Sequence, residues 1–188
     1  MRLLVLPLAA AVVALVAPRP ARAAEDPPRY RNDLSTNPIR FGILHFQIEY
    51  ERVVADRWTI FGAPIFFHHA TWYPFAHAPE TTANGYGLDL GFRYTFGDAP
   101  AGVYVGPLLS AYHGEVRRSG VQTLEGYVFS GGVQAGYTWL LGRLLLSVGG
   151  GLSYGVATDR APEGSPRAAD LPHRGVWLNV RGNVGFAF

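Results

Sequence analysis

The sequence predicts an all-β protein, namely a transmembrane antiparallel up-and-down β-barrel of eight strands with a small polar lumen. Long segments alternate between apolar residues and small or polar residues, which is typical of strands with two different faces. The composition also favours strands, with 23 Gly, 10 Tyr and 11 Phe but a single Met. The third observation is an export signal at the start of the chain. At 188 residues, one domain is expected.

The first 23 residues are expected to form a secretory signal peptide that is cleaved after Ala23. Met1 and Arg2 give a positive start, residues 3–17 are uncharged, and Ala21-Arg22-Ala23 has the small-x-small pattern of a cleavage site. The alternative is a retained membrane helix, but this run is shorter than the roughly twenty apolar residues that cross a bilayer. We therefore expect export to a bacterial outer membrane.

Residues 24–37 are polar and Pro-rich, and they either lead into the first strand or contribute to it; the barrel domain is expected over 38–188. Segments 38–52, 58–69 and 101–116 alternate less regularly than the later ones. Seven strands are visible, whereas a barrel with both termini on one side needs an even number. The missing strand is expected within residues 29–41, with a bend at Pro38 or Gly42.

The clearest strand runs from Tyr86 to Phe96. One face carries Tyr86, Leu88, Leu90, Phe92, Tyr94 and Phe96, and the other carries Gly85, Gly87, Asp89, Gly91, Arg93, Thr95 and Gly97. Residues 127–140, 144–156 and the last segment of the chain alternate in the same way. Because the small and charged face is unsuited to a dry core, we expect the apolar face to meet lipid. Most of these segments are also long enough for a tilted strand to cross a membrane.

The predicted connections alternate in length. Short turns are expected at residues 53–57, at 98–100 and near Gly142, and longer polar loops at 70–84, 117–124 and 158–172. This pattern is typical of outer-membrane barrels, whose short turns face the periplasm. Aromatic residues near the strand ends are expected to form two interfacial girdles. They are Trp58, Tyr94, Phe96, Tyr137 and Trp139 on the short-turn side, and Tyr86, Tyr127 and Tyr154 on the long-loop side.

The chain ends Val184-Gly185-Phe186-Ala187-Phe188. With Phe186 and Phe188 at alternating positions, it resembles the C-terminal signal that the outer-membrane assembly machinery reads. Overall the mature chain resembles the small eight-stranded OmpA-like and OmpX-like barrels. The run from Phe46 to Arg52, with the short turn and strand after it, also resembles an uncharacterised family of small exported barrel proteins. These resemblances imply a fold and a location, and no known activity.

The predicted inner face carries a set of polar side chains that eight strands would bring close together. We expect opposite charges there to pair as a structural plug, and a gated ion path is the functional alternative. The members of this predicted polar network are Glu49, Glu51, Asp89, Arg93, Gln134, Asn179 and Arg181.

Composition excludes several kinds of site. The chain has no Cys, and its sixteen basic residues are all Arg, so thiol chemistry, P-loop lysines and Schiff-base lysines are excluded. Loss of Arg2, Arg19 and Arg22 with the signal peptide leaves thirteen arginines against fourteen acidic residues, which argues against a nucleic-acid partner. No metal or cofactor is expected.

Two motifs raise the question of catalysis. Residues 151–155 match the G-x-S-x-G pattern, followed by Asp159, Asp170 and His173, but that motif needs a strand, an elbow and a helix rather than an alternating strand. His68-His69, with Thr71 and Trp72, lies at an outer strand end, where lipid-trimming barrel enzymes keep a His and Ser pair. The H-x-S-N arrangement of those enzymes is absent, and adjacent residues of a strand face opposite ways.

The sequence thus favours a monomeric, non-enzymatic outer-membrane protein of structural or surface-interaction type. Its expected partners are outer-membrane lipid, lipopolysaccharide and the assembly machinery. Arginines in the predicted loops are candidates for contact with lipopolysaccharide: Arg117, Arg118, Arg160 and Arg167. Two alternatives remain open, a lipid-modifying barrel enzyme that uses the rim histidines, and a soluble periplasmic ligand-binding barrel with its faces reversed.

Overall fold

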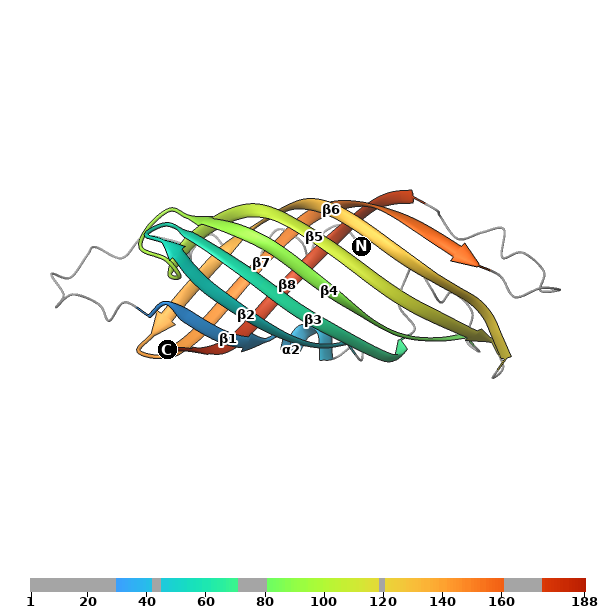
Figure 1. The fold of residues 1–188 in the computed structure, drawn as a ribbon. Helices are drawn as coiled ribbons and strands as arrows, with labels where there is room; N and C mark the ends of the chain where they lie inside the picture. The colour runs from blue at the N-terminus through green and yellow to red at the C-terminus, as the bar shows by residue number, and fades with distance from the viewer. Residues whose placement is uncertain (1–29, 42–44, 71–80, 119–120, 161–173) are drawn as a thin grey trace, which may run out of the picture.

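The computed structural model describes residues 30–41, 45–70, 81–118, 121–160 and 174–188. In these residues eight antiparallel strands follow one another in sequence order and close into a barrel (Figure 1). The predicted fold class is therefore confirmed. The predicted signal peptide lies outside the described residues.

The strands differ in length. The first has only 5 residues, while the others have between 11 and 21, which is long for strands of water-soluble proteins. They are β1 (Asn32–Thr36), β2 (His45–Ala55), β3 (Trp58–Ala70), β4 (Thr81–Thr95), β5 (Gly102–Arg118), β6 (Val121–Leu141), β7 (Leu144–Arg160) and β8 (Arg174–Ala187); one short helix, α2 (Pro38–Phe41), follows β1.

Strand β1 is the additional strand that an even strand number requires, and it lies within the segment that was predicted to be a polar lead-in or part of the first strand. Thr36 pairs with Ile48 of β2 on one side and with Val184 of β8 on the other, so that β1 closes the barrel. The predicted strand over 38–52 is wrong at its start, because Pro38 begins helix α2 and does not bend a strand. Proline has no amide hydrogen to donate and its fixed φ suits the first turn of a helix, which explains this outcome.

The register around the barrel sets its tilt. Starting from Thr36 of β1, the residues that lie opposite one another on successive strands are Ile48, Pro64, Leu88, Ala111, Phe129, Val156 and, on β8, Arg174. Thr36 itself pairs with Val184 of β8, so the circuit around the barrel closes with an offset of ten residues. Such a stagger requires strands that are tilted to the barrel axis, and an eight-stranded barrel of this kind has room inside only for side chains.

Both described ends of the chain lie with the short turns. Asn32 and Phe188 exchange two backbone hydrogen bonds of 3.1 and 2.8 Å, at the end that also holds the Asp56–Arg57 turn. The turn between β6 and β7 uses Gly142, whose φ of 63° is a conformation that favours glycine. We call this the short-turn end, and the opposite one the loop end.

The prediction of a long loop over 117–124 is wrong. Strand β5 runs to Arg118 and β6 begins at Val121, with Arg117 paired to Gln122 and Arg118 paired to Val121. Ladder hydrogen bonds hold the hairpin together there, and a strand outside a membrane does not need an apolar outer face. Arg160 likewise ends β7 instead of lying in a loop, and Arg167 lies outside the described residues.

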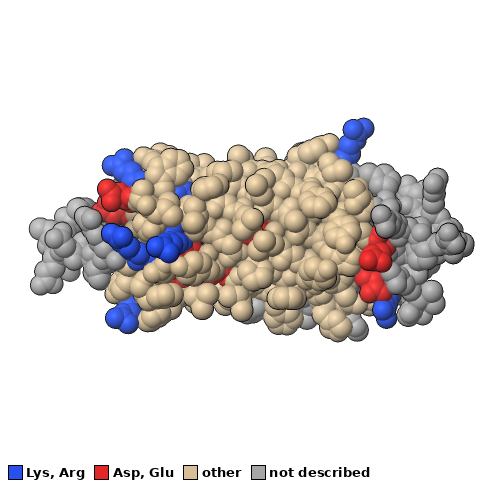
Figure 2. Space-filling model, viewed as in Figure 1, with Lys and Arg blue, Asp and Glu red and all other residues tan. Residues whose placement is uncertain are grey.

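The two faces of the wall are oriented as predicted. On β4, Tyr86 and Leu90 are 56% and 47% exposed on the outside, while Asp89 is fully buried inside. Figure 2 shows charged side chains gathered toward the two ends, with a broad, almost uncharged band between them. The one described helix, α2, has 4 residues and is too short to cross a membrane.

Candidate functional site

A cluster of buried charged side chains crosses the lumen on the short-turn side of its centre. Glu49 of β2 is its hub: its carboxylate accepts hydrogen bonds from Arg93 of β4 at 2.7 Å, from Asn183 of β8 at 3.1 Å, and from Arg181 of β8. Glu49 is only 1% exposed, and Arg93 and Arg181 are 3% and 2% exposed. We call Glu49, Glu51, Arg93, Arg181 and Asn183 the charged cluster.

The second carboxylate of the cluster shares one of these arginines. Glu51 lies two residues from Glu49 on the same face of β2, and it accepts hydrogen bonds from Arg93 and from the Thr59 hydroxyl. The Arg93 guanidinium also lies 4.2 Å from the centre of the Phe61 ring, and Arg181 lies 4.8 Å from the same ring. Phe61 therefore packs against both cations and helps to fix their positions.

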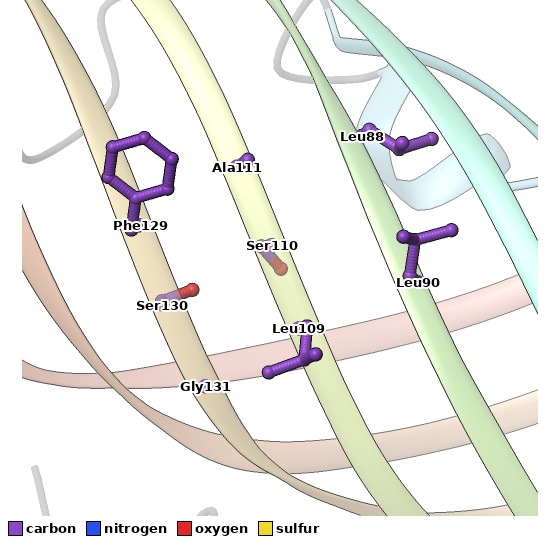
Figure 3. Close-up of a pocket in the computed structure, with 8 residues that line it drawn as sticks. All are labelled: Leu88, Leu90, Leu109, Ser110, Ala111, Phe129, Ser130 and Gly131. Carbon is purple, nitrogen blue, oxygen red and sulfur yellow. The ribbon is translucent and has the colours of Figure 1, made fainter.

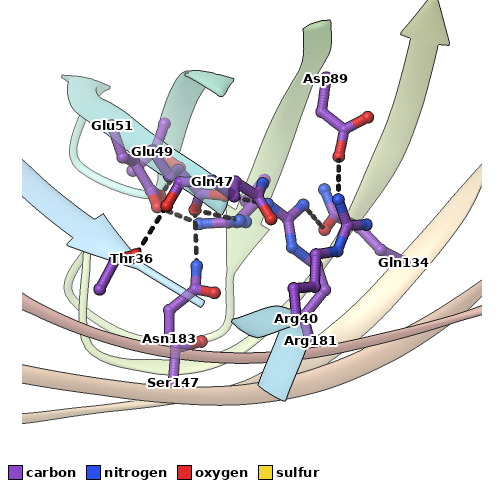
Figure 4. Close-up of polar contacts among 12 residues, drawn as sticks. Thr36, Arg40, Gln47, Glu49, Glu51, Asp89, Gln134, Ser147, Arg181 and Asn183 are labelled. Carbon is purple, nitrogen blue, oxygen red and sulfur yellow. Dashed lines mark hydrogen bonds and ion pairs between the residues drawn. The ribbon is translucent and has the colours of Figure 1, made fainter. Parts of the chain in front are cut away.

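A third link carries the cluster across the lumen. Arg181 donates a hydrogen bond of 3.0 Å to the side-chain oxygen of Gln134, on β6. Strands β2, β4, β6 and β8 are thus joined through side chains in the interior (Figure 4). Since the carboxylates already accept hydrogen bonds from guanidinium groups, this arrangement favours a structural plug over an acid or base poised for catalysis.

A separate ion pair lies closer to the loop end. Asp89 of β4 is 3.5 Å from Arg40 of helix α2, and it accepts a hydrogen bond of 2.5 Å from the Tyr112 hydroxyl of β5. Arg40 is partly accessible, with 12% of its side chain exposed. Through this contact α2 is attached to the far wall of the barrel.

Inward aromatic side chains lie over glycines of neighbouring strands. Tyr104 lies against Gly136 and Gly149, where any larger side chain would collide with its ring, and Trp177 lies against Gly155 in the same way. The inward glycines therefore make room for bulky neighbours in a narrow barrel.

Six of the seven residues predicted for the polar network are at most 5% exposed and face the lumen; they are Glu49, Glu51, Asp89, Arg93, Gln134 and Arg181. The seventh, Asn179, is half-buried and donates a hydrogen bond of 2.6 Å to Ser153. Five of these six form one connected network of hydrogen bonds and ion pairs. The sixth, Asp89, contacts Arg40 and Tyr112 instead.

Sequence reasoning omitted several lumen residues from this network. Asn183, Gln47 and Asp33 are 4%, 1% and 2% exposed, and alternation with the apolar residues beside them was a signal that could have found them. Arg40 carried no such signal, because it lies on a helix where a strand was expected.

The residues of the two catalytic motifs are not assembled into a site in the described part of the chain. Ser153 is buried in the middle of strand β7, which continues as a strand to Arg160, while Asp170 and His173 lie outside the described residues. His68 is exposed on β3, and the side chain of His69 lies outside the described part. No group of three metal-ligating side chains occurs among the described residues.

The predicted girdle residues contact one another on the outer face. At the short-turn end the Trp58 and Tyr94 rings are 5.0 Å apart, and the Tyr137 and Trp139 rings 4.7 Å. At the loop end His113 lies between Tyr86 and Tyr127, at ring distances of 5.1 and 4.8 Å. Such bands suit the two boundaries between membrane and water.

A shallow groove runs between β4, β5 and β6 on the outer wall (Figure 3). Leu88, Leu90, Leu109 and Phe129 border it, and the small residue Ala111 lies between them. Ser110 and Ser130 also line it, and its other members are apolar or glycine.

Comparison with known proteins gives a family but no characterised relative. Residues 14–160 match the profile of a family described as "Protein of unknown function (DUF3575)", a stretch that reaches from the predicted signal peptide to the end of β7. No curated protein and no solved structure matches the chain.

Proposed function

The chain belongs to the DUF3575 family of proteins of unknown function, and we propose that it is an integral outer-membrane protein. In this proposal it acts as an envelope component or through contacts at its surface, and it does not catalyse a reaction. It reaches its location through a cleaved signal peptide and functions as a monomer.

The direction of the two faces carries this proposal. Large apolar side chains cover the outside of the wall, while Glu49, Asp89, Arg93 and Arg181 are buried within it. In water such a barrel would expose most of its apolar surface and bury its charges, which is unfavourable on both counts. In a bilayer the same arrangement is favourable, because the backbone groups of a closed barrel are already paired. A soluble periplasmic barrel would need the opposite orientation.

The charged cluster supports a structural role for the lumen. Its ion pairs and hydrogen bonds connect β2 with β4 and β8, and they occupy the interior of a barrel that holds little besides side chains. For an ion to pass, Arg93 and Arg181 would have to leave Glu49, and breaking buried ion pairs is costly. We therefore favour a plug over a conducting pore.

Two surface features support the proposed partners. The β5–β6 hairpin ends in exposed Arg117, which donates a hydrogen bond of 2.8 Å to Glu115 and is accessible to anionic headgroups at the loop end. At the opposite end Phe186 and Phe188 are 49% and 54% exposed, so the terminal aromatic side chains are accessible to the assembly machinery.

The experiment is fractionation of cells that express the full chain, combined with gel migration before and after heating. We expect the mature protein, beginning after Ala23, in the outer-membrane fraction, with faster migration of the unheated sample because folded barrels resist dodecyl sulfate. Recovery as a soluble periplasmic monomer would overturn the proposal. Lipid analysis with and without expression, and with His68 and His69 replaced, tests the enzymatic alternative: an altered lipid pattern that depends on the histidines would contradict a non-catalytic role.

A further inference from the structure

Two exposed arginines lie on the outer face of the barrel at the short-turn end. Arg52 is on the outward face of β2, opposite Asn32 of β1. Arg143 is in the turn between β6 and β7, and its guanidinium carbon lies 5.7 Å from the centre of the Phe186 ring on β8. Because neighbouring strands are about 5 Å apart, β8 and β2 are separated by about 10 Å, with β1 between them. The two arginines therefore flank the same part of the wall.

The charges of these two arginines are not balanced on the outer face. Within the described ranges, no carboxylate forms an ion pair with Arg52 or Arg143. The buried carboxylates of Asp33 and Glu51 belong to β1 and β2, but they face the lumen on the other side of the wall. Arg31, just before β1, is also exposed and adds to the positive charge at this end. Figure 2 shows basic side chains on the left, at the short-turn end, beside the uncharged band.

The surface between the two arginines is apolar. Leu34 of β1 and Phe186 of β8 lie opposite each other on the outer face, and each is 49% exposed. Tyr50 of β2, opposite Leu34, is 43% exposed, and its hydroxyl donates a hydrogen bond of 2.8 Å to Asn32. The polar ends of this surface thus lie toward the short turns, while its apolar side chains continue into the band above. We call Arg52, Arg143, Leu34, Tyr50 and Phe186 the arginine-flanked surface.

The charges of this surface determine which occupant it fits. A guanidinium group binds phosphate oxygens through two parallel hydrogen bonds, and the apolar side chains between the arginines suit acyl chains. A zwitterionic headgroup would bring its own cation close to Arg52 and Arg143, whereas an anionic headgroup would not. Because Leu34 and Phe186 are part of the wall that faces lipid in the proposed location, a lipid reaches this surface more readily than a protein in the surrounding water.

We propose that the arginine-flanked surface binds an anionic phospholipid of the phosphatidylglycerol class. Arg52 and Arg143 hold the headgroup phosphate from two sides, and the acyl chains lie along Leu34 and Phe186. The inference rests on the proposed membrane location, because the acyl chains lie in an apolar medium only there. It adds a lipid class for the short-turn side, in contrast to the lipopolysaccharide proposed for the loop end.

The test measures which lipid contacts Trp58, a diagonal neighbour of Arg52 on the outer face that is 47% exposed. Trp72, Trp139 and Trp177 are replaced by Phe, and the full mature chain is folded in phosphatidylcholine vesicles. The probes are phosphatidylglycerol and phosphatidylcholine with bromine on their acyl chains, which quenches tryptophan fluorescence on contact. At low salt we expect the relative binding constant to favour phosphatidylglycerol by about fivefold for each arginine that contacts the headgroup. The preference should largely disappear in about 1 M salt.

Arg52→Gln and Arg143→Gln should each lower this preference about fivefold, and the double variant should abolish it. Arg57→Gln is the matched control. Arg57 is exposed and directly precedes the reporter Trp58, but its charge interacts with those of Asp56 and Asp98, so the preference should be retained.

Three outcomes overturn the inference: equal quenching by the two probes in the parent barrel, an unchanged preference in the double variant, or an equal loss of preference in Arg57→Gln. Heat-modifiable migration of each variant shows that its barrel has folded. Loss of the lipid preference in a heat-modifiable protein of the outer membrane rejects the anionic phospholipid but not the proposed location, which fractionation tests separately.

Discussion

The two halves of the lumen are filled in different ways. Toward the short-turn end, the charged cluster and the side chains around it are almost fully buried and joined by ion pairs from several strands. Toward the loop end, aromatic and glycine residues predominate, Trp177 and Asn179 are half-buried, and Gln47 lacks partners for its amide. The first half is joined by several ion pairs between strands and the second by fewer, while buried polar atoms without a hydrogen-bond partner occur in both.

This difference predicts where substitutions cost the most stability. A buried ion-pair network is costly to break, because removing one member leaves another charge buried without a counter-charge. Half-buried polar side chains such as Asn179 can be hydrated when a partner is removed, so their hydrogen bonds contribute less stability. We therefore expect substitutions in the charged cluster to lower stability more than substitutions in the loop-side half.

The largest effect is expected for Glu49→Ala. This change removes the hub carboxylate and leaves Arg181 and part of Arg93 buried without a counter-charge, which costs about 3 to 5 kcal/mol of unfolding free energy. Urea unfolding of the folded barrel in lipid vesicles, followed by tryptophan fluorescence, measures it.

The matched comparison is Ser153→Ala in the loop-side half. It removes the hydroxyl that accepts the 2.6 Å hydrogen bond from Asn179, which is only half-buried and can bind water instead. The expected loss is about 1 kcal/mol. Equal losses for the two variants would contradict the distinction between the halves.

The next effect concerns the outer wall and separates a membrane barrel from a soluble one. Val133 is 61% exposed on β6, in the apolar band. In a bilayer, Val133→Arg should cost about 2 to 4 kcal/mol, the cost of a charge near the midplane. On a barrel whose outer face contacts water, the same change would alter the free energy of unfolding by about 0.5 kcal/mol or less. Unfolding in vesicles against detergent-free buffer distinguishes these outcomes.

Much of this fold follows from alternation. A strand with two different faces places Asp89 and Arg93 inside and Leu90 and Phe92 outside whatever its neighbours are, so that local pattern alone gives the orientation. A barrel with both termini on one side needs an even number of strands, which predicted an eighth strand, and β1 lies within the range expected for it. The placement of the network residues in the lumen follows from the same rule.

What the sequence did not reveal depends on contacts between distant segments. Nothing local marks Arg40 as the partner of Asp89, because the contact depends on a helix whose position is set by the short length of β1. The 117–124 hairpin was missed because its ladder is held by backbone pairing and not by an apolar face. The choice of Glu49 over Glu51 as the hub likewise depends on how β8 closes on β1.

A smaller effect is expected for Asp89→Asn. It removes the charge opposite Arg40, but Arg40 is 12% exposed and can be hydrated, and asparagine still accepts a hydrogen bond from Tyr112. The expected loss is about 1 to 2 kcal/mol, clearly less than that of Glu49→Ala. Urea unfolding under the same conditions gives the comparison, and a loss as large as that of Glu49→Ala would show that α2 is as important for stability as the charged cluster.

The smallest effect on stability is expected for Arg117→Ala, at the tip of the β5–β6 hairpin. Its bond to Glu115 joins two side chains that are 48% and 26% exposed, so the pair contributes about 0.5 kcal/mol or less. Binding of lipopolysaccharide vesicles should nevertheless weaken and become less sensitive to salt, because one arginine fewer faces the phosphates. Arg57→Ala is the matched control, since Arg57 is an exposed arginine that donates a hydrogen bond of 3.1 Å to Tyr94 at the short-turn end. If Arg57→Ala weakened binding to vesicles as much as Arg117→Ala does, charge alone and not the loop end would govern the interaction, and the surface role proposed for the hairpin would be lost.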